Sequence, residues 1–209
     1  RTAFATGFRA PQAFDEDLHI DTVGGAARLI ENDPNLVAER SMSFAQQVAY
    51  KTELPGDLDL RLGVNGYLNR LDNAFVLNER DDPATPEEEV IRENRGTTTV
   101  VGAEIEASLA AKTWSVRAGW TVEDARNEEP DEDFGRNRLF RTPNLYGYLE
   151  GLVKVGGFQL QTGIDFTGPM LVPRLDENAD PLEVIDSPWF AAWDLNISYA
   201  ALIVDALVI

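Results

Sequence analysis

Apolar and polar residues alternate one by one along much of the chain. In the stretch LDLRLGVNGYLN, which begins at Leu58, alternate positions separate into two sets. The apolar set is Leu58, Leu60, Leu62, Val64 and Leu68, and the polar set is Asp57, Asp59, Arg61, Asn65, Tyr67 and Asn69. Successive side chains of a β-strand point to opposite faces of its sheet. This period of two therefore predicts a strand with one apolar and one polar face.

The same period recurs from one end of the chain to the other. Glycine and β-branched residues are common in these segments, which disfavours a helix. We expect about nine strands, each with one apolar face. The first ends near Phe8, and the others span residues 41–54, 58–77, 97–109, 113–125, 139–155, 157–167, 188–199 and 203–209.

The connections between these strands are short and long in strict alternation. The short ones cover residues 54–57, 110–112 and 155–157, and the long, acidic ones cover residues 78–95, 127–138 and 171–187. Short turns on one side and long loops on the other are typical of an outer-membrane barrel. A soluble sandwich distributes its loop lengths more evenly between its two ends. The predicted fold is therefore all-β, an antiparallel up-and-down transmembrane β-barrel.

The two faces of the predicted strands support this interpretation. Aromatic residues on the apolar faces fit the girdles of a barrel; they are Trp114, Trp120, Trp189, Trp193 and Tyr199. Charged residues on the polar faces fit a wet or plugged lumen; they are Arg61, Glu104, Glu106, Arg117, Glu123, Glu150, Lys154 and Asp165. The outer surface of a soluble all-β module would also carry such charges, so that alternative stays open.

Composition excludes several other classes of protein. A net charge of −18 argues against a nucleic-acid partner, which needs a Lys/Arg surface. The chain has no cysteine and one histidine, His19, so thiol catalysis, a Cys-based zinc site and a Ser-His-Asp triad are not expected. The apolar stretch from Ala200 to Ile209 contains Asp205 and is too short for a membrane-spanning helix. No nucleophile–base pair stands out, so we do not expect an enzyme.

Three short motifs resemble the TonB-dependent receptors of outer membranes. The first is Gly7-Phe8-Arg9-Ala10-Pro11, where members of the family have a GFRAP-like strand end. The second runs from Asp33 to Glu39 and resembles the family's N-P-x-L-x-x-E element, with Asp33 in place of Asn and Ala38 where Pro is frequent. The third is Asn94-Arg95-Gly96, followed by Val101-Gly102-Ala103-Glu104. Their order and spacing match the C-terminal part of the family's barrel.

This resemblance implies a plugged barrel of roughly 22 strands. Residues 1–209 would then be a partial barrel, without the plug domain and the first strands. The ending Leu207-Val208-Ile209 departs from the aromatic residue that usually closes the family's last strand. The implied location is the outer membrane of a Gram-negative-type cell. The implied partners are the lipid bilayer, a small-molecule ligand and, through the plug, the TonB complex.

The implied function is import of a scarce ligand, such as a metal chelate, a siderophore or cobalamin, with energy coupled through TonB. A passive porin or channel fits the polar lumen as well and remains an alternative. The candidate ligand-binding regions are the long connections 78–95, 127–138 and 171–187, together with the inward Arg61 and Arg117. No resident cofactor is expected apart from a possible calcium ion.

The calcium candidate is the D-x-N-x-D spacing of Asp176, Asn178 and Asp180. An EF-hand loop needs glycine at its sixth position and glutamate at its twelfth, where this chain has Pro181 and Ser187. The run Asp131-Glu132-Asp133 is a second carboxylate-rich candidate. In each case the ordinary explanation is a solvated acidic loop.

Overall fold

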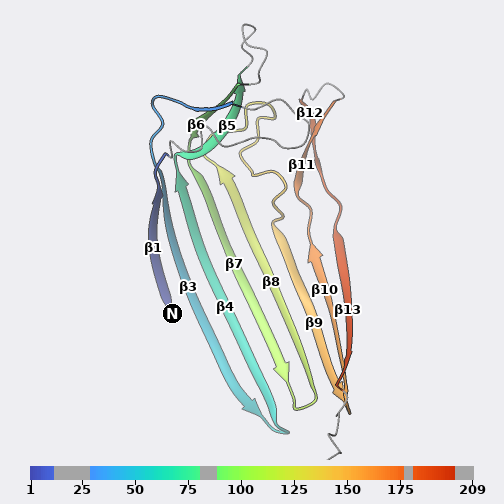
Figure 1. Cartoon of the computed structure of the whole chain (residues 1–209). Coiled ribbons are helices and arrows are strands. Elements are labelled where there is room, and N and C mark those ends of the chain that lie inside the picture. The colour runs from blue at the N-terminus through green and yellow to red at the C-terminus, as the bar shows by residue number, and fades with distance from the viewer. Residues whose placement is uncertain (12–28, 81–88, 177–180, 201–209) are drawn as a thin grey trace, which may run out of the picture.

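A computed structural model gives the fold of residues 1–11, 29–80, 89–176 and 181–200. Every regular element in these ranges is a strand, which confirms the predicted all-β class. Within these same ranges, no helix is long and apolar enough to cross a membrane. Figure 1 shows long strands running side by side, with smaller strands gathered beyond one end of the sheet.

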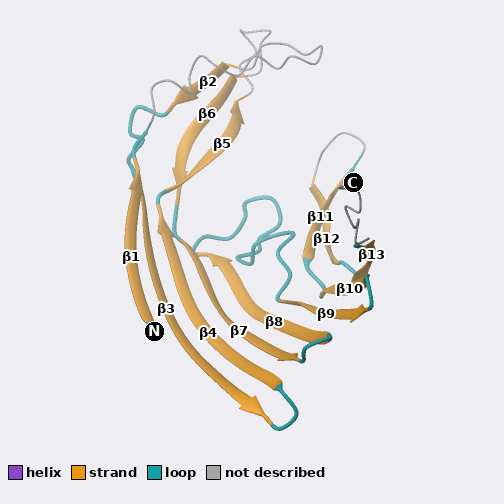
Figure 2. Ribbon diagram, turned by 60° about the horizontal axis from the view of Figure 1, so that its bottom comes forward, coloured by secondary structure: helices purple, strands orange, loops and turns teal. Residues whose placement is uncertain are grey.

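The main sheet contains eight strands in the order β1-β3-β4-β7-β8-β9-β10-β13, and every neighbouring pair in it is antiparallel. Strands next to each other in this sheet also follow each other along the chain, which is the predicted up-and-down order. The eight strands are β1 (Thr2–Arg9), β3 (Glu39–Leu54), β4 (Leu58–Asp72), β7 (Thr98–Ala110), β8 (Trp114–Asn127), β9 (Leu145–Val155), β10 (Phe158–Thr167) and β13 (Phe190–Tyr199). Figure 2 shows the sheet curved like a section of a cylinder wall.

The short connections lie together at one end of the sheet, as predicted (Figure 1). In the turn between β3 and β4, Gly56 and Asp57 adopt positive φ values of 87° and 56°. In the turn between β9 and β10, Gly156 has a φ of 58°. Glycine adopts this backbone region without steric cost, and Asp tolerates it better than most residues do. These turns set the register of the strands that they join.

Two of the long connections contain strands, which corrects the prediction that residues 78–95 and 171–187 are loops. Strands β5 (Ala74–Arg80) and β6 (Glu89–Arg95) form an antiparallel pair, and β2 (Leu29–Asn32) joins β6 in parallel. Strands β11 (Leu171–Leu175) and β12 (Pro181–Asp186) form a second hairpin. Acidic composition suggested loops, but β-branched residues such as Ile91, Val172 and Val184 favour extended backbone there. The third long connection, after β8, is irregular as predicted.

Two predicted strands differ from the structure by more than two residues at one end. The strand expected over residues 58–77 breaks at Asn73, whose φ of 57° turns the chain out of the main sheet into β5. The strand expected over residues 139–155 begins only at Leu145. Pro143 lacks the amide hydrogen that a continued ladder requires, and Arg141 has a positive φ of 56°. The strand predicted over residues 203–209 lies outside the described residues.

The register places the alternating residues on two distinct faces, a polar face and an apolar face. On the apolar face, Leu68 lies beside Val101, and Val64 lies beside Ile105. No second layer of the described structure buries these residues, since Ala125 is the one buried apolar residue in the described part of the chain. Leu62 is 44% exposed and Trp193 is 66% exposed. A soluble sandwich would bury this face against a second sheet, whereas a membrane barrel presents it to lipid.

Candidate functional site: the polar wall and its rim

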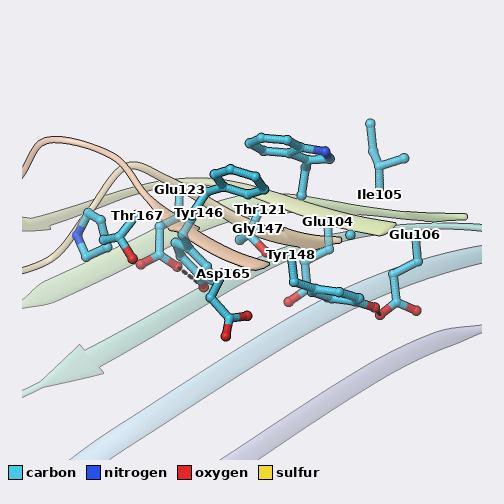
Figure 3. A pocket seen from close by; sticks show the side chains of 14 residues that line it. Glu104, Ile105, Glu106, Thr121, Glu123, Tyr146, Gly147, Tyr148, Asp165 and Thr167 are labelled. Carbon is cyan, nitrogen blue, oxygen red and sulfur yellow. Dashed lines mark hydrogen bonds between the residues drawn. The ribbon is translucent and has the colours of Figure 1, made fainter. Parts of the chain in front are cut away.

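The polar face of the sheet carries carboxylates and tyrosines in two adjacent cross-strand rows. The first row is Asn65, Glu104, Thr121, Tyr146 and Thr167, and the second is Gly63, Glu106, Gly119, Tyr148 and Asp165. In Figure 3, Glu104, Glu106 and Tyr148 point to one side of the sheet, and Ile105 points to the other. We call this surface the polar wall.

Tyrosine hydroxyls on the polar wall donate hydrogen bonds to its glutamates. Tyr67 donates to Glu123 at 2.8 Å, and Tyr148 donates to Glu106 at 3.1 Å. A longer bond of 3.5 Å runs from Tyr146 to Glu123. The Asn65 amide donates to Glu104 at 3.0 Å. An ionised carboxylate has about four lone-pair sites, so each glutamate keeps acceptor capacity for a further partner.

Two glycines make the tyrosine contacts possible. Tyr67 and Glu123 are separated by strand β7, where Gly102 lies between them. A Cβ on Gly102 would approach the Tyr67 ring to 2.5 Å, and a Cβ on Gly119 would approach the Tyr148 ring to the same distance. Contacts this short do not occur for real side chains. Each ring therefore lies over a glycine of the intervening strand. Its hydroxyl reaches the carboxylate on the strand beyond that glycine.

The two arginines predicted to face inward both lie on the polar wall, in the same row. Arg61 faces Ser108, Ser108 faces Arg117, and Arg117 faces Glu150. The Arg117 guanidinium donates to Glu150 Oε2 from Nη2 at 2.6 Å and from Nε at 3.2 Å, and it lies 5.6 Å from the centroid of the Tyr148 ring. The charge of Arg117 is therefore paired within the wall, which limits its attraction for an anion.

The three sequence motifs meet at the rim where the long connections begin. The side chain of Asn94 accepts from the Val37 amide at 2.8 Å and donates to the carbonyls of Val37 and Asn73 at 2.9 and 2.8 Å. Glu39 accepts from the Phe75 amide at 2.7 Å and pairs with Arg9 at 3.7 Å. These contacts join strand β1, the Asp33–Glu39 segment and the β5–β6 hairpin. Each motif thus has a structural role at this rim.

The connection over residues 127–138, another ligand-binding candidate, is held by turns of its own. The Asp131 carboxylate accepts from the Phe134 amide at 3.1 Å, and the Asp131 carbonyl accepts from the Gly135 amide at 2.8 Å. Asn137 donates to the carbonyls of Asn127 and Glu128 at 3.2 and 3.0 Å. The Asp131 side chain is therefore already used to cap a turn.

The calcium candidates remain a prediction. Asp176 is described, whereas Asn178 and Asp180 lie outside the described residues. In the ranges that the structure covers, no group of three or more His, Cys, Asp or Glu side chains is placed to hold a metal ion. Ligand binding by the connections 78–95, 127–138 and 171–187 also remains a prediction.

The sequence placed the glutamates of the polar wall on the correct face but did not identify their tyrosine partners. The usable signal is a tyrosine, a glycine and a glutamate that fall in one row when three strands are aligned. Finding that row requires the register, which the alternation alone does not supply.

The chemistry of the polar wall is that of binding. It offers carboxylate acceptors, tyrosine hydroxyls and the ion pairs Arg117–Glu150 and Lys51–Asp59. A curved antiparallel sheet with an uncovered apolar face and a charged face opposite it is the wall of a transmembrane β-barrel.

Comparison with known proteins identifies the kind of barrel. The family model described as "TonB dependent receptor-like, beta-barrel" matches residues 1–206. The chain therefore belongs to the TonB-dependent receptor β-barrel family, whose members are transport receptors of the Gram-negative outer membrane. A comparison with curated protein sequences found no match.

Solved structures agree with this assignment at the level of the fold. FrpB, an iron transporter from Neisseria meningitidis, matches 96% of the chain with a TM-score of 0.66 and 11% identity. The copper transporter OprC matches 97% with a TM-score of 0.63 and 14% identity. The ferripyoverdine receptor of Pseudomonas aeruginosa matches 98% with a TM-score of 0.60 and 16% identity. The chain covers only 30%, 29% and 25% of those three proteins.

Proposed function

We propose that this chain forms part of the barrel of a receptor that imports a scarce ligand across the outer membrane with energy coupled through TonB. The observation that carries the proposal is the family match over residues 1–206. The transporters with similar folds are named for copper, iron and ferripyoverdine, so a metal ion or metal chelate is the first ligand class to test. Cobalamin is the second.

The polar wall fits such a receptor better than an open pore. Its glutamates are hydrogen-bonded by tyrosines and asparagine, and they retain acceptor sites that cationic groups of a plug domain would satisfy. The outer connections carry the ligand contacts in this proposal, because they lie at the end of the barrel opposite the short turns. The TonB complex acts through the plug, which would be supplied by the rest of the receptor.

The test is uptake by cells that carry the full-length receptor in their outer membrane. Radiolabelled iron chelates, copper and cobalamin would be supplied separately, with and without a protonophore. We expect accumulation of one ligand class, with at least a tenfold loss when the protonophore removes the energy source. Equal uptake in both conditions, together with steady conductance in planar bilayers, would indicate a passive porin and contradict the proposal.

A second measurement addresses the soluble alternative. The uncovered apolar face predicts that the full-length protein is extracted from cells only by detergent. A folded full-length monomer that stays in solution without detergent would contradict the membrane assignment.

A further inference from the structure

A row of arginines follows directly after the apolar residues on the lipid-facing side of the sheet. On strands β4, β7 and β8, Leu68, Val101 and Asp124 lie side by side. The next row toward the long connections is Arg70, Thr99 and Arg126. The backbone of Arg126 also forms an isolated antiparallel β-bridge with that of Arg138. We call Arg70, Arg126 and Arg138 the basic row.

The basic row is accessible and lies on the same face as the uncovered apolar residues. The side chains of Arg70, Arg126 and Arg138 are 46%, 64% and 40% exposed. Leu68 and Val101, one row closer to the short turns, are 38% and 48% exposed. The surface therefore changes from apolar to basic within one step along the strands.

Two aspartates hold this row in place without neutralising it. Asp124 pairs with Arg126 Nε at 2.6 Å and lies 3.9 Å from Arg138 Nε. Asp72 pairs with Arg70 Nε at 2.9 Å, and its register partner on the neighbouring strand β3 is Arg40. Four arginines thus meet two aspartates, in a chain whose net charge is −18. The positive excess is local and runs against the charge of the whole protein.

Asp72 also accepts a 2.8 Å hydrogen bond from the Thr97 hydroxyl. The Nε of Arg138 is buried and has no hydrogen-bond partner within the described structure. The exposed parts of the three arginine side chains offer guanidinium donors to an additional anion, and guanidinium groups bind phosphate oxygens well.

We propose that the basic row binds the phosphate of a lipid headgroup in the outer leaflet. A lipid fits because its acyl chains would lie on the apolar residues while its phosphate reaches the arginines one row beyond them. This inference rests on the proposed function, in which the apolar face meets lipid and the long connections lie on the outer side. Interfacial arginines attract anionic lipids by this electrostatic effect.

The experiment compares two lipids that differ only in their phosphate. Full-length receptor in non-ionic detergent would be doped with phosphatidic acid or with diacylglycerol of the same acyl chains, and bound lipid counted by native mass spectrometry. We expect retention of phosphatidic acid and little retention of diacylglycerol. The double variant Arg126→Gln/Arg138→Gln should retain phosphatidic acid about fivefold to tenfold less. Lys51→Gln, which removes one exposed cation from the opposite face, should leave retention unchanged.

A second variant tests the proposal in the opposite direction. Asp124→Asn removes the carboxylate that pairs with Arg126 and Arg138, so retention of phosphatidic acid should rise. Misfolding could mimic the first result but not this one. Equal retention of both lipids, or displacement by millimolar inorganic phosphate, would overturn the lipid site. Failure to enter detergent at all would instead contradict the membrane assignment.

Discussion

The Tyr67 hydroxyl donates a 2.8 Å hydrogen bond to the Glu123 carboxylate although the whole of strand β7 lies between the two residues. Gly102 on β7 leaves the space that the Tyr67 ring occupies. Tyr148, Gly119 and Glu106 repeat the arrangement from β9 across β8 to β7. The polar wall is thus tied across three strands at two places.

Adding a methyl group at Gly102 should displace Tyr67. We expect Gly102→Ala to lower the free energy of unfolding by about 1–3 kcal/mol, because the new Cβ would lie 2.5 Å from the Tyr67 ring. Urea unfolding of the full-length receptor in detergent measures this. Gly63→Ala is the matched control, because Gly63 lies on the same face and a Cβ there would have no atom within 4 Å. Equal effects of the two substitutions would contradict the proposed role of Gly102.

The hydrogen bond itself can be isolated by a double-mutant cycle. Tyr67→Phe and Glu123→Ala should each cost stability, and we expect a coupling free energy of about 1 kcal/mol between them. Tyr50→Phe, on the exposed apolar face, should show no coupling to Glu123→Ala. A coupling near zero for the first pair would mean that solvent replaces the bond without cost.

Asn94 should control the order of the rim rather than the stability of the barrel. Asn94→Asp removes both amide donors and places a carboxylate against the carbonyls of Val37 and Asn73. We expect faster hydrogen exchange over residues 33–38 with little change in the unfolding midpoint of the main sheet. Hydrogen-exchange mass spectrometry reads both regions at once. Asn69→Asp, at an exposed position of β4, should leave exchange at the rim unchanged.

The orientation of the barrel can be tested on intact cells. Leu175 is 54% exposed in the β11–β12 hairpin, and Lys112 lies in a short turn at the opposite end. In a full-length receptor freed of other cysteines, Leu175→Cys should react with a membrane-impermeant maleimide and Lys112→Cys should not. After the cells are lysed, both should react. Labelling of residue 112 alone on intact cells would reverse the assigned orientation.

Much of the barrel could be predicted because one face must be apolar. A shift of one residue would move every side chain of a strand such as β4 to the other face, so the alternation indicates both the strands and their faces. The break at Asn73 was missed because a single left-handed residue leaves the period on either side intact. The parallel pairing of β2 with β6 joins residues far apart in sequence, and no local pattern marks it. The acidic composition of residues 78–95 concealed the strands β5 and β6.

The polar wall shows the same division between local and long-range information. The charges of Glu104, Glu106 and Glu123 followed from the alternation. Their partners followed only from the register, which places Tyr67 opposite Gly102 and Gly102 opposite Glu123. The rim contacts of Asn94 join residues 57 positions apart.

The two tyrosine–glutamate hydrogen bonds that cross over an intervening strand also affect how the strands can move. Strands in an antiparallel sheet can slide past one another if their ladder bonds exchange partners one register further on. Such sliding of β4 against β8 would separate Tyr67 from Glu123, and sliding of β9 against β7 would separate Tyr148 from Glu106. A load applied to one strand is therefore shared by its second neighbour as well as its first. In the proposed function a plug domain moves against this wall, and the two hydrogen bonds would oppose sliding of its strands.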